Sequence, residues 1–95
     1  MQSGDLVVDT VTRKAFLGEE ELYLADVEFD VLAALMERKG ETVERQWLFE
    51  NIVGGEDIHL VDFCIKWLRE KIEIGADLSK RRFITVRGVG YRFEG

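Results

Sequence analysis

The sequence has no proline, a single cysteine and no long apolar run, and each shortage excludes a class of protein. It also has no low-complexity segment and no repeat of about 20 to 50 residues, so a linker or a solenoid has no support. Cys64 alone cannot form an internal disulfide or a thiolate metal cluster, which favours the reducing cytoplasm. Since no stretch approaches the ~20 apolar residues of a membrane span, we expect no membrane contact.

The chain offers little material for an active site. His59 and Cys64 are its only histidine and cysteine, and their positions lie ~140° apart on a helix, which disfavours an imidazole–thiolate pair. The acidic clusters 19–21 and 56–57 lack the ligand spacing of a calcium loop, so we interpret them as solvated turns. We therefore expect no catalysis, no cofactor and no metal.

Charge is distributed unevenly along the chain. There are 13 basic and 19 acidic residues, for a net charge of −6, and this total counts against nucleic acid because a domain that binds phosphates is expected to be basic. Residues 1–65, however, carry 5 basic and 15 acidic side chains, whereas residues 66–95 carry 8 basic and 4 acidic ones. The second segment is therefore +4, and the acidic total still permits a DNA-binding face there.

The 95 residues suffice for one domain, over 1–95. Short β-rich segments separated by turns predict an antiparallel meander. Apolar residues three and four positions apart predict helices, the second of them capped by Thr42. A β-rich end with the glycine-containing loop 88–90 predicts a hairpin, in which we expect Tyr91 to pack as a core aromatic. The expected elements are strands over about 5–25, helices over about 27–38, 43–53 and 57–74, and the hairpin over about 82–94.

The helix predicted over 57–74 has the strongest pattern, with three kinds of side chain on three faces. One face is an apolar stripe suited to the core: Ile58, Val61, Ile65, Leu68 and Ile72. The neighbouring stripe is charged: His59, Asp62, Lys66, Arg69 and Glu73. The side away from the core is a second apolar sector: Leu60, Phe63, Cys64 and Trp67. Two apolar sectors indicate that the helix has two partners.

Residues of a family pattern occur along nearly the whole chain: Leu24, Glu28-Phe29, Leu32, Gly40, Val43, Arg45, Leu48, Val61-Asp62, Ile65, Leu68-Arg69 and Lys71. The most specific match is the last one, Thr85-Val86-Arg87-Gly88-Val89-Gly90-Tyr91-Arg92-Phe93. On these residues the chain resembles the winged-helix effector domains of OmpR/PhoB-type bacterial response regulators. The resemblance implies an α+β winged helix-turn-helix with an N-terminal β-meander, three helices and a C-terminal β-hairpin wing.

The resemblance also implies a function, namely the DNA-binding domain of a cytoplasmic transcriptional regulator in a two-component phosphorelay. The third helix would enter the major groove of double-stranded DNA, and Arg87 on the wing would reach the minor groove. Homodimers would bind tandem half-sites. The implied DNA contacts are His59, Asp62, Phe63, Lys66, Trp67, Arg69, Thr85 and Arg87.

Two departures from the family pattern affect this function. Phe63 and Trp67 stand where the family places side chains that touch base edges, and an aromatic ring can contact thymine methyls but cannot make the paired hydrogen bonds by which arginine reads guanine. The connection over 54–57 looks shorter than the family loop that contacts RNA polymerase in activators. A receiver domain with its phosphorylatable aspartate does not fit within 95 residues.

An alternative function stays open on the sequence alone. The domain could be a protein-interaction or dimerisation module with weakened or lost DNA binding. Exposure of Trp67 would support such a module, and burial of Trp67 would remove its main support. Its apolar anchor would be Leu60, Phe63, Cys64 and Trp67.

Overall fold

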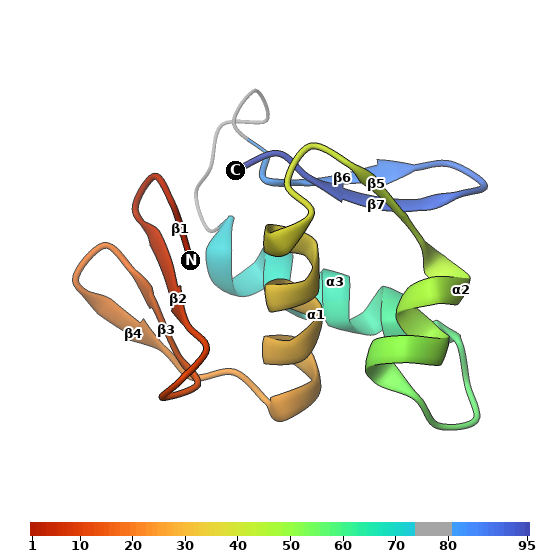
Figure 1. Cartoon of the computed structure of the whole chain (residues 1–95), viewed down its shortest axis with the longest axis horizontal. Helices are drawn as coiled ribbons and strands as arrows, with labels where there is room; N and C mark the ends of the chain where they lie inside the picture. Colours follow the sequence, from red (N-terminus) through yellow and green to blue (C-terminus); the bar gives the residue numbers. More distant parts are fainter. Residues whose placement is uncertain (74–80) are drawn as a thin grey trace.

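Two antiparallel sheets lie on different sides of the helices in the computed structural model, which describes residues 1–73 and 81–95 (Figure 1). The first sheet has the strand order β1-β2-β3-β4, so each strand pairs with the next along the chain. This confirms the predicted meander, and it adds a short first strand before it. The strands are β1 (Gln2–Ser3), β2 (Leu6–Asp9), β3 (Lys14–Leu17) and β4 (Glu20–Leu22).

Helix α1 (Asp26–Glu37) follows the meander and is joined to the third helix by a partly buried ion pair. Oε1 of Glu28 accepts a hydrogen bond from the backbone N–H of Ala25 at 2.9 Å, which satisfies one donor at the start of the helix. The same carboxylate lies 2.9 Å from Nζ of Lys71. Because Glu28 is buried, its charge needs this partner.

The segment predicted as the second helix contains three elements. β5 (Thr42–Glu44) comes first, then α2 (Arg45–Leu48), and a π-helical turn, η1, covers Phe49–Val53. Thr42 is therefore not a helix cap, since it pairs with Arg92 in β7. A strand this short has no sequence signature of its own, because its hydrogen-bonding partner lies about fifty residues further along the chain.

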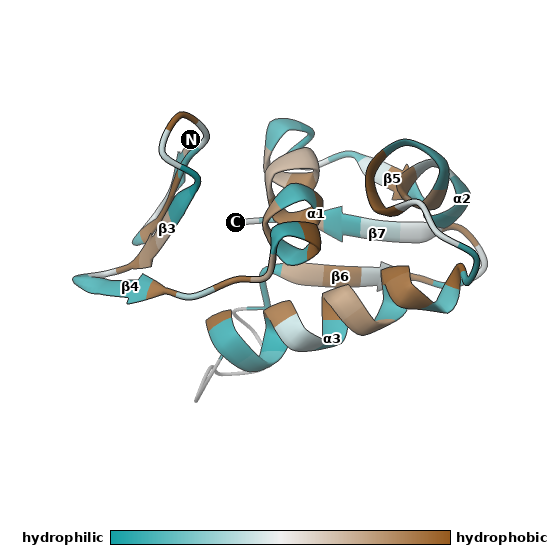
Figure 2. Cartoon of the chain, turned by 90° about the horizontal axis from the view of Figure 1, so that it is seen from below, coloured by the Kyte–Doolittle hydropathy of each residue, from teal (hydrophilic) through white to brown (hydrophobic). Residues whose placement is uncertain are grey.

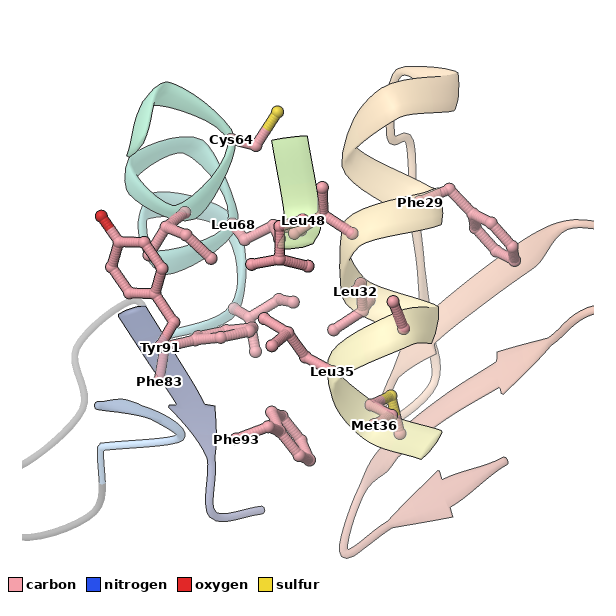
Figure 3. Close-up of a cluster of buried hydrophobic side chains, with 14 of the residues drawn as sticks. Phe29, Leu32, Leu35, Met36, Leu48, Cys64, Leu68, Phe83, Tyr91 and Phe93 are labelled. Carbon is pink, nitrogen blue, oxygen red and sulfur yellow. The ribbon is translucent and has the colours of Figure 1, made fainter. Parts of the chain in front are cut away.

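Helix α3 (His59–Ile72) packs the predicted apolar stripe into the core. Val61, Ile65, Leu68 and Ile72 are buried, while Ile58 is half-buried at the start of the helix. Figure 3 shows Leu68 among side chains from α1, α2 and the terminal hairpin. In the part of the chain that the structure describes, no helix is both long enough and apolar enough to cross a membrane.

The terminal hairpin is formed by β6 (Phe83–Val86) and β7 (Gly90–Phe93), and we call these strands with their connecting loop the wing. β7 is the central strand of the second sheet, with the order β5-β7-β6. The loop end of the wing projects away from the meander (Figure 1). These strands and helices confirm the predicted α+β winged helix-turn-helix.

The close approach of β7 to β5 requires a glycine at position 90. A Cβ there would lie 2.0 Å from the backbone oxygen of Val43 and 2.7 Å from the backbone nitrogen of Arg45. Neither backbone atom can move aside by changing a rotamer. The absence of a side chain at position 90 therefore permits the wing to join the rest of the fold.

Gly90→Ala should destabilise the domain by about 3 kcal/mol or more, because the added methyl group overlaps backbone atoms. The free energy of unfolding is measured by urea denaturation. Gly88→Ala is the matched control in the same hairpin: a Cβ there meets nothing within 4 Å, and its positive φ of 75° alone should cost about 1 kcal/mol. Equal losses in the two variants would contradict this account of Gly90.

Candidate nucleic-acid interface

One side of α3 faces solvent next to the wing. In Figure 2 the helix runs along one edge of the molecule, beside β6. The exposed side chains follow one another at helical spacing and so form a single stripe. We call this stripe the exposed face of α3, and it consists of His59, Phe63, Lys66, Trp67 and Glu70.

Two aromatic rings dominate the exposed face. Phe63 and Trp67 are one helical turn apart, and their rings are stacked with centroids 6.0 Å apart and an angle of 20° between the planes. Phe63 is 49% exposed and Trp67 is 37% exposed. Neither ring is part of the core, so a large apolar surface remains available on a helix that already has its core stripe.

The charged stripe beside this face is largely occupied by bonds to the wing. Nη2 of Arg69 donates hydrogen bonds to the backbone oxygen of Phe83 at 3.0 Å and to Oγ1 of Thr85 at 2.7 Å. Oε1 of Glu73 accepts from the backbone N–H groups of Arg82 and Phe83, at 2.7 and 3.0 Å. These side chains hold the start of the hairpin against the helix.

Asp62 makes the third connection, near the other end of α3. The guanidinium of Arg45 donates to both of its carboxylate oxygens, with Nη2 2.6 Å from Oδ2, and the hydroxyl of Tyr91 donates to Oδ1. Asp62 therefore joins the start of α2 to β7 of the wing. We call Asp62, Arg69 and Glu73, with the groups they bind, the helix–wing contact.

The contact shifts the pKa values of its members in opposite directions. Burial opposes ionisation of Asp62, but hydrogen bonds from Arg45 and Tyr91 outweigh it and lower the pKa of this carboxyl group. Burial, together with the hydrogen bond to Asp62, raises the pKa of Tyr91 to about 12. Across the ordinary pH range the carboxylate of Asp62 is therefore ionised and accepts a hydrogen bond from the protonated hydroxyl of Tyr91.

Four of the eight basic side chains of the +4 segment form bonds within the domain. Besides Arg69 in the helix–wing contact and Lys71 paired with Glu28, Arg82 pairs with Asp5 and Arg92 pairs with Glu94. Among the described residues of this segment, three exposed cations make no hydrogen bond or ion pair with another described residue: Lys66, Arg81 and Arg87. Lys80 lies outside the described residues. Fewer cations are thus available to a ligand than the charge count suggests.

The predicted site residues divide into three places. His59, Phe63, Lys66 and Trp67 share the exposed face of α3, and Arg87 is exposed at the loop end of the wing. Asp62, Arg69 and Thr85 are brought together in the helix–wing contact instead. Sequence reasoning assigned no role to Arg45, because its pairing with Asp62 joins two segments 17 residues apart and leaves no local pattern.

The second apolar sector needs a correction at Cys64. We expected this side chain on the solvent side, but it is fully buried, and Figure 3 draws it with the core cluster. Burial also raises the pKa of its thiol to about 11. Leu60 is half-buried against the core. The anchor of the alternative protein-interaction module therefore reduces to Phe63 and Trp67. Trp67 is exposed, as that module requires, and it is the similarity to DNA-binding domains reported below that does not favour the alternative.

Comparisons with known proteins agree with this geometry. The family model described as "Transcriptional regulatory protein, C terminal" matches residues 18–93. The KDP operon transcriptional regulatory protein KdpE of Escherichia coli (strain K12) is 36% identical over 93 residues, covering 94% of this chain and 40% of KdpE. The chain thus spans about 40% of the length of the curated relatives that it matches.

Solved structures show the same architecture. The response regulator DrrB of Thermotoga maritima, an OmpR/PhoB homologue, superimposes with a TM-score of 0.87 at 34% identity, covering all of this chain and 44% of DrrB. The DNA-binding domain of Klebsiella pneumoniae RstA, solved in complex with the RstA box, gives a TM-score of 0.78 at 30% identity and covers 99% of this chain and 95% of that one.

The Asp62–Tyr91 bond can be tested by titrating the phenol. The chain has two tyrosines, so the Tyr23→Phe variant leaves Tyr91 as the only source of tyrosinate absorbance, which should appear with a midpoint near pH 12. Adding Asp62→Asn should lower this midpoint, whereas Asp57→Asn, which changes an acid outside the contact, should not. An ordinary midpoint near 10.0 in the parent variant would contradict the bond.

The same shift makes stability depend on alkaline pH. Because the folded state raises the pKa of Tyr91, the stabilisation is complete below pH 10 and is lost as the pH rises through about 12. Tyr91→Phe should lose about 1 kcal/mol of stability at pH 7 and show a smaller further decline above pH 10 than the unmodified chain. Urea denaturation at a series of pH values measures both effects.

Proposed function

This chain belongs to the "Transcriptional regulatory protein, C terminal" family, the winged-helix DNA-binding domains of response regulators, and we propose that it binds double-stranded DNA through two separate elements. In this proposal α3 enters the major groove with its exposed face, and the wing lies along the adjacent minor groove with Arg87 directed into it. No catalysis is part of the proposal. The bound molecule is DNA, and the result is regulated transcription.

The observation that carries the proposal is the exposed face of α3 held beside a projecting wing. A helix of 14 residues with one side free has the size and accessibility that a major groove about 12 Å wide admits. The wing gives a second cationic position, Arg87, separated from Lys66 on the helix. The RstA domain, which is similar throughout its length, is a DNA-binding domain solved with its DNA box.

We assign different tasks to the predicted contact residues. His59, Phe63, Lys66 and Trp67 would meet DNA directly, with Lys66 on a phosphate and Arg87 in the minor groove. Asp62, Arg69 and Thr85 would act indirectly, because their hydrogen bonds within the helix–wing contact set the angle between α3 and the wing. Moving the wing relative to the helix would displace Arg87 from the groove next to α3.

The arrangement of cations sets the expected strength of binding. Each phosphate neutralised contributes about −0.9 to the slope of log affinity against log salt concentration. If Lys66, Arg81 and Arg87 are the cations available, the slope should be near −3 at most. We therefore propose modest affinity for one domain, and pairs of domains on tandem half-sites about 10 base pairs apart would raise it.

Other features of the whole protein remain proposals, because this chain spans less than half the length of its curated relatives. We propose that the protein acts in the cytoplasm, where the DNA is, and that phosphorylation of a receiver domain is the signal in a two-component system. RNA polymerase is a candidate partner at the short connection over 54–57, between η1 and α3. If a single copy of the domain bound to one half-site were the only complex formed with DNA, the proposed pairing of domains on tandem half-sites would be contradicted.

Arg87→Ala should flatten the salt dependence of DNA binding by about one unit, because one ion contact is lost. The affinity for a fluorescent duplex is measured by anisotropy at several salt concentrations. Lys14→Ala is the control: this cation is exposed in the meander, away from α3 and the wing, and its removal should leave the slope unchanged.

Two outcomes would contradict the proposed function. If the unmodified chain gives no anisotropy change with micromolar duplex at low salt, it does not bind DNA in this way. If it binds, but Arg87→Ala and Lys14→Ala change the slope equally, the wing is not a contact.

A further inference from the structure

The exposed face of α3 is poor in the side chains that read purines. Guanine is commonly read by paired hydrogen bonds from arginine or lysine, and adenine by asparagine or glutamine. Of the five side chains of the exposed face only Lys66 is of these types, and the one arginine of the neighbouring stripe, Arg69, is bound to Phe83 and Thr85 of the wing. Because the proposed function places Lys66 on a phosphate, direct recognition of bases must use a different chemistry.

The polar side chains of the exposed face are also partly occupied by other contacts. The ring of His59 lies 2.8 Å from a carboxylate oxygen of Asp57, at Nδ1. Lys66 is the only cation on the face, and the proposed function uses it for phosphate. Glu70 is an acceptor when ionised, so among the bases it suits cytosine, and its charge opposes a nearby phosphate.

The largest contact surface left is the stacked pair of Phe63 and Trp67. In the major groove the only apolar group that differs between bases is the C5 methyl of thymine, since cytosine carries hydrogen at that position. The ring centroids are 6.0 Å apart, which lies between one and two base-pair steps of ~3.4 Å along the helix axis. The pair can therefore meet methyl groups on neighbouring base pairs or on base pairs two steps apart.

We propose that Phe63 and Trp67 are the specificity-determining residues of this domain, and that they select DNA sites with neighbouring thymines by contacting their methyl groups in the major groove. The proposal rests on the proposed function. It adds the class of DNA sequence that is chosen and the two side chains that choose it. Burying one methyl group should be worth about fourfold in affinity, which is about 0.8 kcal/mol.

The test compares thymine with deoxyuridine, which keeps every hydrogen-bonding group of thymine and lacks only the methyl. Duplexes that the chain binds are first selected from a randomised pool, and each thymine of a selected site is then replaced singly by deoxyuridine. We expect about fourfold weaker binding at each of one or two neighbouring positions and no change elsewhere. The ratio of the two affinities is measured by fluorescence anisotropy.

Protein variants show which side chains recognise the methyl group. In the double variant Phe63→Ala/Trp67→Ala, the ratio of the affinity for thymine to that for deoxyuridine should fall to about one at the sensitive positions. Circular dichroism checks that this variant is folded, as expected because both side chains lie outside the core. Tyr23→Ala is the matched control: it removes an aromatic ring that is 81% exposed but lies before α1, and it should leave the ratio unchanged.

The outcomes separate this inference from the proposed function. Salt-dependent binding with equal affinity for thymine and deoxyuridine at every position would overturn the inference while leaving DNA binding intact. A methyl preference that persists in the double alanine variant would also overturn it, because other residues would then read the methyl. Failure to bind any duplex would contradict the proposed function, and the inference with it.

Discussion

The attachment of the wing to α3 is the interaction on which the rest of the candidate interface depends. Three side chains on one stripe of the helix reach the wing: Asp62, Arg69 and Glu73. Their partners lie before and along β6 and on β7, so the hairpin is held along its length. Because Gly90 permits β7 to approach β5, the same hairpin is also the centre of a sheet. A fixed angle between helix and wing is what the proposed contact of two separate surfaces with one duplex requires.

This attachment, together with ion pairs to the N-terminal half, occupies cations that would otherwise be available to DNA. Arg69 binds the wing, and Lys71 and Arg82 pair with Glu28 and Asp5 from the acidic segment 1–65. The acidic part of the chain thus neutralises cations of the basic part, and the fold rather than the composition decides which cations remain free. On the exposed face of α3 a single cation and two stacked rings remain. In the proposed function this composition favours contacts with base edges over strong phosphate binding.

Much of the fold could be predicted from the sequence, because periodicity is a local property. The core stripe through Val61 and Leu68 followed from three- and four-residue spacing, and the wing followed from the glycine-containing loop between β-rich segments. Prediction failed at β5, where three residues form a strand only because a distant strand is present to pair with them. It also failed at Cys64, which lies at the border of two sectors, so that a small rotation of the helix decides whether it is buried.

The sequence predicted which residue types the candidate site contains, but not which contacts each side chain makes. The sequence by itself determined that α3 carries an apolar stripe, a charged stripe and a further sector with two aromatic rings, since these depend only on 100° per residue. Only the tertiary structure decided that Asp62 and Arg69 face the wing and that Phe63 and Trp67 stack toward solvent. The physical reason is that a charged side chain bonds to whichever partner the fold brings within about 3 Å, and that partner lies far away along the chain.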